Sequence, residues 1–338
     1  MSDKDTRKAS HAGGRDGWYM ADPAGLDEML DSFLDAVDGP FTGVPGSFAD
    51  GTLPIPGARV VIAPHAGYNY SGKWAAWAYK ALDLTKARRI FVLGPSHTYG
   101  FRGAALTTFA RYATPFGDLA VDQPTVAELR ATGKFADIPR ANDLREHSLE
   151  MHLPYLYKQI ATAFDSLDRY PTIVPILIGS NRLADEQLFG RLLAPYLAQP
   201  DSVFVISSDF CHWGDHFDYK PYTQSSDCSS IRQLGYNDTT PSDPAIHESI
   251  AYIDKQAMGY IEAGDHAGLV ANLAETENTV CGRHPIGVAL AALEQLSLDA
   301  GAAQPDHYRF KFVCYARSKD ITKVDDSSVS YASAYAII

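Results

Sequence analysis

The sequence predicts a single α/β domain with a mixed, mostly parallel central sheet that is flanked by helices. Three short strands are predicted over residues 60–63, 89–93 and 203–206, and apart from the leading Arg89 they are apolar without a break, as is typical of strands buried on both faces of a parallel sheet. Segments with helical spacing alternate with these runs, which favours helices on both faces. Two late segments, 308–316 and 328–337, alternate apolar and polar residues and are predicted as antiparallel strands.

The N-terminal part of the chain divides into a loose segment, a helix and a loop. Residues 1–17 are polar and Gly-rich and are predicted to be flexible, so that the domain covers 18–338. Apolar residues recur at helical spacing over 26–37. Residues 38–57 are rich in Gly and Pro without any period, which predicts a surface loop.

The remaining elements follow the first buried strand. A helix is predicted over 71–82, with Trp74, Trp77 and Ala78 on its inner face. Pro175 should place the strand 172–178 at an edge or a bulge. The other predicted elements are a strand over 104–109, a helix from Asp122 to Thr132, a stretch over 144–160 that Pro154 interrupts, and helices over 184–197, 245–263, 265–274 and 285–296.

Composition narrows the class of protein. With 338 residues, 46% of them hydrophobic, the chain is long enough to bury a full core. Its formal net charge of -12, without a basic cluster, argues against a nucleic-acid binder. No apolar run has the length of a membrane span, and the first residues lack an apolar signal core, so a cytoplasmic protein is expected.

Histidines follow three of the predicted buried strands. His65 comes directly after the strand 60–63, His97 after the strand 89–93, and His212 closely after the strand 203–206. His65 and His97 are 32 residues apart, about one strand-helix-strand unit. Because ligands bind at the carboxyl edge of such sheets, we expect the imidazoles to share one site there.

Cys281 is the candidate thiol for the same site. The chain has four cysteines and no Cys-x-x-Cys pair, so structural disulfides are not expected. Cys281 precedes a predicted helix, and both the helix N-terminus and Arg283 should lower its pKa. Three interpretations stay open: a metal ligand, a nucleophile, or an inert buried thiol.

Two imidazoles and one thiolate would leave metal positions open for water or substrate, and such a set suits zinc, iron or copper. His212 then has two possible roles, as a fourth ligand or as a general acid/base. Asp209 would orient an imidazole or act beside His212. Trp18 and Tyr68 adjoin Gly/His segments and are candidates for the pocket wall. Arg283 would bind an anionic ligand, although a salt bridge to a carboxylate is equally compatible with the sequence.

The segment from Glu146 to His152 superficially resembles a metalloprotease helix, but its two histidines, His147 and His152, are five residues apart instead of four. It is therefore predicted as a structural polar helix at the edge of the site, with an orienting role as the alternative. The sequence contains neither a phosphate-binding loop nor a serine-hydrolase elbow.

The chain resembles the Memo family, named for mediating cell motility driven by receptor tyrosine kinases. The resemblance covers nearly the whole chain and is carried by several long motifs. These motifs are Ser10–Gly13 with Trp18-Tyr19, Ala63–Tyr68, Leu93–His97, Glu146–Pro154, Ser207–Gly214, Cys281–Gly287 and Asp326–Ala332.

The resemblance implies a fold similar to the class III extradiol dioxygenases, which hold non-haem iron. It also implies His65, His97 and Cys281 as metal ligands, His212 as the site histidine and Asp209 beside it. A cysteine in place of the dioxygenases' carboxylate departs from their pattern. A thiolate is softer and more easily oxidised, which favours copper(I) or iron redox chemistry over ring cleavage.

Two functions follow from the resemblance. The first is a metal-dependent redox protein acting on a small-molecule substrate, with a signalling role in motility and the cytoskeleton. The second is an adaptor that binds phosphotyrosine peptides in the same pocket, and a scaffold that has lost catalysis is a third possibility. The chain departs from the family in a longer spacer at 14–17 and a longer loop at 38–57.

Overall fold

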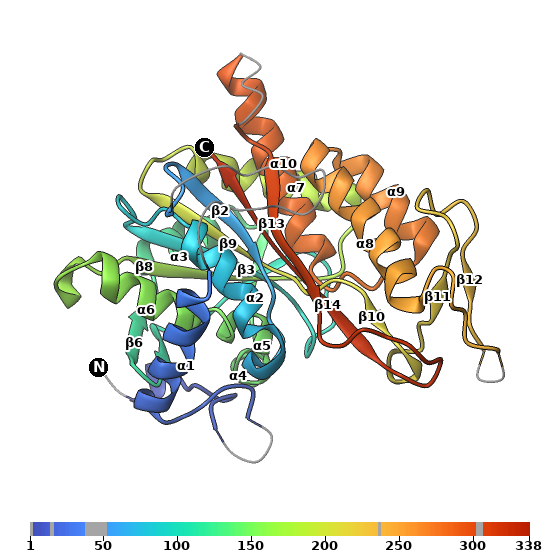
Figure 1. Cartoon of the computed structure of the whole chain (residues 1–338). Coiled ribbons are helices and arrows are strands. Elements are labelled where there is room, and N and C mark those ends of the chain that lie inside the picture. Colours follow the sequence, from blue (N-terminus) through green and yellow to red (C-terminus); the bar gives the residue numbers. More distant parts are fainter. Residues whose placement is uncertain (1–2, 14–16, 38–52, 236–237, 302–306) are drawn as a thin grey trace.

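A nine-stranded mixed sheet runs through the computed structural model, which describes residues 3–13, 17–37, 53–235, 238–301 and 307–338 (Figure 1). Its strand order is β10-β14-β2-β9-β3-β8-β4-β7, and β13 pairs with β14. The strands of this sheet are β2 (Ala58–Ala63), β3 (Arg89–Pro95), β4 (Ala104–Leu106), β7 (Phe135–Asp137), β8 (Thr172–Ile178), β9 (Ser202–Ser207), β10 (His212–Trp213), β13 (Phe310–Arg317) and β14 (Ser328–Ile337).

The four central strands, β2, β9, β3 and β8, are all parallel to one another. Their residues are buried almost without exception, as expected for apolar runs that are covered on both faces. On one side β14 is antiparallel to both β2 and β13, and on the other β4 is antiparallel to β8. The prediction of a mixed, mostly parallel sheet with two late antiparallel strands is confirmed.

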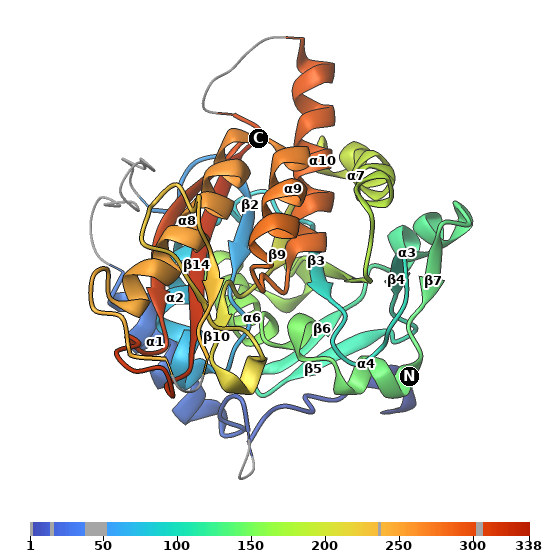
Figure 2. The ribbon, with the colours of Figure 1, turned by 90° about the vertical axis from the view of Figure 1, so that its right-hand side faces the viewer.

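Helices cover both faces of this sheet. On one face α1 packs on α2, which contacts β2, β13 and β14, and on the other α7 and α10 pack together against β9 (Figures 1 and 2). The α-helices are α1 (Pro23–Asp35), α2 (Tyr68–Ala81), α3 (Gln123–Ala131), α4 (Arg140–Arg145), α5 (His147–Glu150), α6 (Leu153–Ala163), α7 (Leu183–Leu197), α8 (Ile246–Ala263), α9 (His266–Thr276) and α10 (Arg283–Ala300). The other short elements are β1 (Thr6–Arg7), β5 (Arg111–Thr114), β6 (Gly117–Ala120), β11 (Pro221–Tyr222), β12 (Arg232–Gln233) and the 3-10 helices Asp3–Asp5, Leu167–Arg169 and Asp215–Phe217.

The inner face of α2 agrees with the prediction at Ala78, which is buried, and differs from it at the two tryptophans. Trp74 and Trp77 are only half-buried, and small residues such as Gly72 and Ala76 are buried instead. A Cβ added at Gly72 would lie 2.5 Å from the ring of Phe33 in α1. Small side chains are therefore what allows the two helices to approach closely, and the bulky indoles lie at the margin of the contact.

Two prolines were expected to interrupt secondary structure, and only Pro154 does so. Pro154 stands in the first turn of α6, so the stretch 144–160 is divided among α4, α5 and α6, as its interruption predicted. The prediction for Pro175 is wrong, because β8 lies inside the sheet between β3 and β4. The ladder with β4 covers only residues 176–178, so the proline lies just outside it.

The N-terminal segment is not loose where the structure describes it. Thr6 and Arg7 pair in parallel with β5, and the side chain of Arg7 is fully buried. Arg7 forms salt bridges with Asp143 at 2.8 Å and Glu150 at 2.6 Å. Two buried carboxylates bind the N-terminus to the body of the protein, a feature that the polar composition of residues 1–17 does not reveal. Residues 14–16 and 38–52, parts of the two segments noted above as long, lie outside the described residues.

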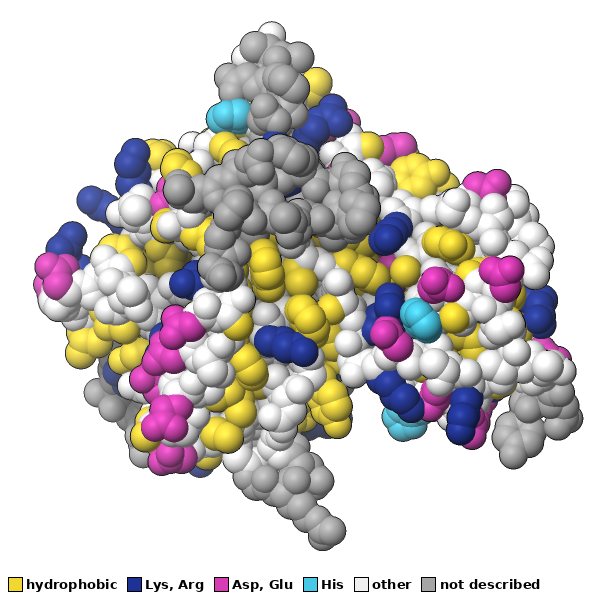
Figure 3. Space-filling model, in the orientation of Figure 1, with side chains coloured by type: hydrophobic (Ala, Val, Ile, Leu, Met, Phe, Trp, Pro, Cys, Tyr) yellow, Lys and Arg dark blue, Asp and Glu magenta, His cyan; other side chains and the backbone are white. Residues whose placement is uncertain are grey.

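The surface carries charges of both signs. On the face shown in Figure 3, Lys and Arg side chains are scattered among Asp and Glu side chains instead of forming one continuous basic patch. Among the helices that the structure describes, none combines the length and apolar character needed to cross a bilayer.

Candidate metal centre

Residues that follow three parallel strands meet at one rim of the sheet. His65 follows β2, His97 follows β3, and Ser207 and Asp209 stand at the end of β9. Cys281 joins them from the turn before α10. The ligand atoms of His65, His97 and Cys281 all lie within 4.8 Å of one another, and the Cys281 Sγ is 3.2 Å from the His65 Nε2. The structure therefore brings together the three residues that the sequence proposed as metal ligands.

The ring of His65 is held in one orientation and one tautomer. Ser207 donates its hydroxyl proton to the carbonyl of Ser148 at 2.8 Å. The Ser207 oxygen can then accept the N–H of the His65 Nδ1, 2.6 Å away. This leaves the lone pair of Nε2 directed at the Cys281 sulfur, as metal coordination requires.

His97 is oriented by a buried carboxylate. The Glu146 side chain accepts the N–H of the His97 Nδ1 at 2.9 Å and the backbone N–H of the same residue at 2.7 Å. Glu146 is fully buried. Burial acts to raise its pKa, but the hydrogen bond and charge of His97 lower the pKa of Glu146 to about 2. The orienting role considered for this segment is thus the one that the geometry supports.

The protonation of the donor set is governed by burial. Burial and the neighbouring imidazoles of His97 and His147 lower the pKa of His65 well below its ordinary value, so the ring is neutral. Burial and the nearby Asp209 carboxylate raise the pKa of Cys281. The prediction that α10 and Arg283 lower this pKa is wrong, because desolvation of the thiolate is the larger effect. A metal bound here would have to displace the thiol proton.

His212 and Asp209 flank the three donors. The His212 ring bonds the Thr279 carbonyl through Nδ1 at 3.1 Å and is not a member of the three-donor group. The Asp209 carboxylate accepts the backbone N–H of His65 at 2.9 Å. This hydrogen bond fixes the turn that carries His65 and does not orient an imidazole ring. Burial raises the pKa of Asp209. Both side chains line the pocket in front of the donors.

This pocket, of about 870 Å³, opens on the rim. Its lining consists of Gly17, Trp18, His65, Ala66, Gly67, Tyr70, His97, His147, Asp209, His212, Phe217, Ser318, Lys319, Ser327, Val329 and Tyr331. The structure places Trp18 in the wall as the sequence suggested, but neither Tyr68 nor Arg283 lies there. Tyr68 is buried, with its hydroxyl donated to the Met151 carbonyl at 2.7 Å. Arg283, the first residue of α10, is exposed outside the lining.

His147 is the pocket residue that the sequence reading missed. Its ring stacks on His97 with centroids 4.4 Å apart and contacts Trp18 with centroids 4.2 Å apart. Burial lowers the pKa of His147 to about 3. Its ring, together with His97 and Glu146, forms a second group of potential ligands within 4.8 Å. The motif is visible in the sequence, but the spacing of its residues along a helix does not place His147 at the pocket, because the structure has only the four-residue α5 there.

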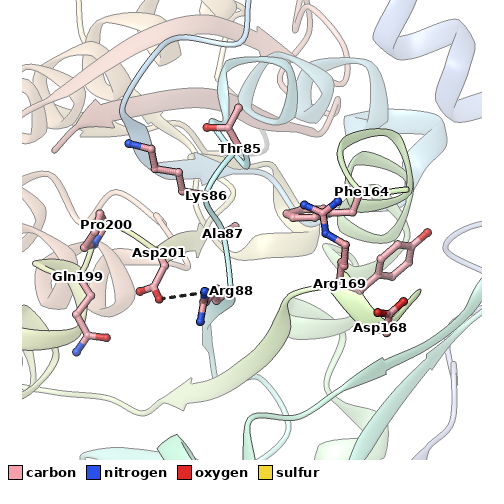
Figure 4. Close-up of a pocket in the computed structure, with 11 residues that line it drawn as sticks. Thr85, Lys86, Ala87, Arg88, Phe164, Asp168, Arg169, Gln199, Pro200 and Asp201 are labelled. Carbon is pink, nitrogen blue, oxygen red and sulfur yellow. Dashed lines mark ion pairs between the residues drawn. The ribbon is translucent and has the colours of Figure 1, made fainter. Parts of the chain in front are cut away.

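A second pocket, of about 860 Å³, lies at the opposite end of the strands (Figure 4). Segments that precede β3 and β9 line it, and its charged side chains include Arg88 and Asp201, which are 3.9 Å apart. The lining contains no imidazole and no thiol. The groups of potential metal ligands therefore lie at the first pocket.

Comparison with known proteins agrees with these motifs. Residues 7–335 match the family model described as Memo-like protein. The chain belongs to the Memo-like family. The human Protein MEMO1 is 40% identical over 327 residues, which make up 97% of this chain and 96% of the relative. The Protein MEMO1 of Xenopus tropicalis is 40% identical over 332 residues (98% and 97%), and the Protein memo-1 homolog of Caenorhabditis elegans is 39% identical over 328 residues (97% and 81%). The Memo-like match spans His65, His97 and Cys281.

Proposed function

We propose that this Memo-like chain is a metal-dependent redox protein that holds iron or copper through His65, His97 and Cys281. The observation that carries the proposal is the convergence of these three donor atoms within 4.8 Å. The donors also fit the group, because a hydroxyl and a carboxylate occupy the Nδ1 atoms of the two rings and leave both Nε2 atoms available. Likeness of the fold to the class III extradiol dioxygenases belongs to the same proposal.

A two-imidazole, one-thiolate set suits soft or borderline metals, so copper(I), iron and zinc compete for it. A redox-active metal bound there would supply one-electron chemistry to a substrate in the pocket. The chain itself supplies a neutral His65, a thiol that loses its proton on binding, and His212 at the pocket wall to move a proton. Asp209 holds the His65 turn in place.

Metal content of the purified protein tests this proposal. Wild-type protein and the variants Cys281→Ser and Cys314→Ser are loaded with iron(II), copper(I) or zinc and measured by elemental mass spectrometry. We expect Cys281→Ser to lose tightly bound metal, and Cys314→Ser, a buried free thiol outside the donor group, to keep it. Equal metal content in the two variants would remove Cys281 from the site and defeat the proposal.

Redox turnover requires a separate measurement. Oxygen consumption by the loaded protein with catechols and with simple reductants distinguishes an active oxidoreductase from a scaffold that has lost catalysis. Turnover that disappears in Cys281→Ser supports the enzyme. A loaded protein without turnover on either kind of substrate supports the scaffold.

A phosphotyrosine peptide is the second candidate ligand, because the aromatic rings of Trp18, Tyr70, Phe217 and Tyr331 line the pocket. Arg283 lies outside this lining, so the imidazoles and Lys319 would have to meet the phosphate. Calorimetry with one peptide in phosphorylated and plain forms tests the idea. Equal affinities of the two forms would exclude it.

We also propose a cytoplasmic location and a signalling role connected with cell motility. The location is supported by the four cysteines, all described by the structure and all free, because reducing compartments keep thiols unpaired. The signalling role rests on the family resemblance. Cell fractionation and imaging of a tagged protein test the location. Wound closure by cells that carry Cys281→Ser tests the signalling role.

A further inference from the structure

Four buried tyrosines lie ring to ring behind the metal pocket. The ring centroids of Tyr19 and Tyr68 are 5.4 Å apart, those of Tyr68 and Tyr155 are 5.4 Å apart, and those of Tyr155 and Tyr79 are 4.5 Å apart. None of the four side chains is more than 5% exposed. We call these four residues the tyrosine relay. Because phenol and indole are the side chains that lose an electron most easily, a contiguous run of them is a path for oxidising equivalents.

The tyrosine relay begins at the wall of the metal pocket. Trp18, the residue before Tyr19, lines the pocket and contacts the ring of His147, which stacks on the proposed ligand His97. An oxidant formed in the pocket thus faces an indole first. The phenol of Tyr19 is the next group along the chain.

The two ends of the tyrosine relay have proton acceptors. Tyr19 donates its hydroxyl to the Glu150 carboxylate at 2.8 Å, and the hydroxyl of Tyr79 lies 2.6 Å from the His152 Nδ1. Burial lowers the pKa of His152 to about 3, so its ring is neutral and can accept. An oxidised phenol is a far stronger acid than a phenol, so a radical persists where a base takes the proton.

The middle of the tyrosine relay has no such base. Tyr68 donates to the Met151 carbonyl and Tyr155 to the Gly72 carbonyl, each at 2.7 Å. Backbone carbonyls are poor bases, so these two phenols can pass a charge but cannot retain it. The tyrosine relay therefore has a site that can hold a radical at each end, joined by two phenols that can only transmit the charge.

Tyr79 is the better of these two end sites. The Glu150 carboxylate at the Tyr19 end already accepts hydrogen bonds from Arg7 and from the backbone and ring of His11. The His152 ring has Tyr79 as its hydrogen-bond partner, and its Nε2 is buried without a partner among the residues that the structure describes. Among the described residues, Glu150 therefore already accepts a hydrogen bond from the cation Arg7, whereas His152, the proton acceptor at Tyr79, does not.

We propose that the tyrosine relay conducts an oxidising equivalent out of the metal pocket and stores it on the Tyr79–His152 pair. The oxidant is hydrogen peroxide, and the inference rests on the proposed function because a metal held by His65, His97 and Cys281 would supply one electron. Reduction of one peroxide to two waters breaks the O–O bond and consumes two electrons and two solvent protons. The second electron comes from Tyr79, whose O–H proton moves to the His152 Nδ1. The products are two waters, the metal oxidised by one electron, a phenoxyl radical and an imidazolium.

Pulse radiolysis of the metal-free protein tests the relay without the metal. Azidyl radicals oxidise tryptophan faster than tyrosine, so an indolyl radical forms first. We expect it to decay into a phenoxyl radical at a rate independent of protein concentration. Tyr79→Phe should lose most of the phenoxyl yield, and Trp18→Phe should lose part of it.

Tyr315→Phe is the control, because Tyr315 is partly buried and also donates its hydroxyl to a carboxylate, that of Asp254 at 2.8 Å. It should keep the wild-type yield. Tyr155→Phe interrupts the bridge and serves where Tyr79→Phe fails to fold, as judged by circular dichroism. Equal phenoxyl yields in folded Tyr155→Phe or Tyr79→Phe and in Tyr315→Phe would overturn the relay.

The loaded protein adds a second readout. After iron loading, peroxide addition and rapid freezing, electron paramagnetic resonance should show a tyrosyl signal that Tyr79→Phe lacks. Absence of the signal in loaded wild-type protein would overturn the peroxide step. If Cys281→Ser retains metal while radiolytic transfer persists, the proposed function fails and the relay stands, so the two failures are distinguishable.

Discussion

Glu146→Gln is the substitution that probes the metal centre most directly, because it preserves size and removes one charge. The carboxylate is fully buried and accepts four N–H groups: the His97 backbone at 2.7 Å, its Nδ1 at 2.9 Å, Ser148 at 3.1 Å and Thr98 at 3.3 Å. The glutamine amide has only one acceptor oxygen. Its NH2 group must therefore face the N–H groups that one of the two Glu146 oxygens accepts in the wild-type protein. The His97 ring can relieve this conflict by moving its proton to Nε2, the atom needed for the metal.

Two independent quantities give the magnitude. A pKa lowered from 4.5 to about 2 corresponds to about 3 kcal/mol at about 1.4 kcal/mol per pH unit. Hydrogen bonds to charged groups contribute about 1.5–3 kcal/mol. We therefore expect Glu146→Gln to lose about 2–3 kcal/mol of unfolding free energy. If His97 is a metal ligand as proposed, loss of the group that orients it should also weaken metal affinity by about 10–100-fold.

Urea unfolding of the metal-free protein measures the first effect, and competition with a chromogenic chelator measures the second. Glu186→Gln is the matched control, because Glu186 is also buried and also bonds two imidazoles, His266 and His284, each at 2.5 Å. It should lose stability and keep its metal affinity. If Glu146→Gln loses stability but binds metal as tightly as the control, the argument that this carboxylate orients a ligand is refuted.

Two further predictions concern the N-terminus. Arg7→Leu should cost about 3–5 kcal/mol of unfolding free energy, because it leaves two carboxylates buried without their cation. Arg59→Leu is the control: the Arg59 side chain donates to backbone carbonyls, and its loss should cost about 1–3 kcal/mol. Equal losses of stability in urea unfolding would contradict this prediction. Burial acts to raise the pKa of Glu150, but the hydrogen bond from His11 and the charge of Arg7 lower it from 4.5 to about 2. The folded protein thus binds fewer protons than the unfolded chain between these pH values, and this stabilisation is complete above pH 4.5 and lost as the pH falls toward 2. Glu150→Gln should flatten that part of the stability-pH curve, and the exposed Glu294→Gln should leave it unchanged.

The central sheet and its ligand-bearing rim were predictable because they depend on local patterns. Unbroken apolar runs define buried parallel strands, and parallel strands present their carboxyl ends together. His65 and His97 therefore could be placed at one edge from sequence alone. The contribution of Cys281 needed the family resemblance, since nothing local fixes where the turn before α10 packs.

Side-chain direction was the part that sequence could not supply. Tyr68 adjoins the His65 turn in sequence, but it is the first residue of α2, and the helix directs its ring into the core, while Tyr70 is 62% exposed and lines the pocket. For the same reason, the sequence could not show that the Arg283 side chain, at the start of α10, lies outside the pocket lining. The phase of a helix relative to a pocket depends on its packing partners, which a linear pattern does not contain.

Long-range charge pairing was also invisible. Arg7 lies in a polar stretch whose composition predicts flexibility, and its two carboxylate partners lie in the segment 140–150. His147 follows directly after Glu146 but faces the pocket, because α5 lasts only four residues. Both features depend on how the N-terminus docks on distant residues.

The pairing of Arg7 with Glu150 spans 143 positions of the chain. During translation the strand β1 emerges well before its two carboxylate partners, which are made 136 and 143 residues later. The strand must therefore wait with an unneutralised guanidinium until the middle of the polypeptide arrives. Docking of this strand is thus a late event in biogenesis, and a bulky fusion close before it would interfere with it more than one placed at the other terminus.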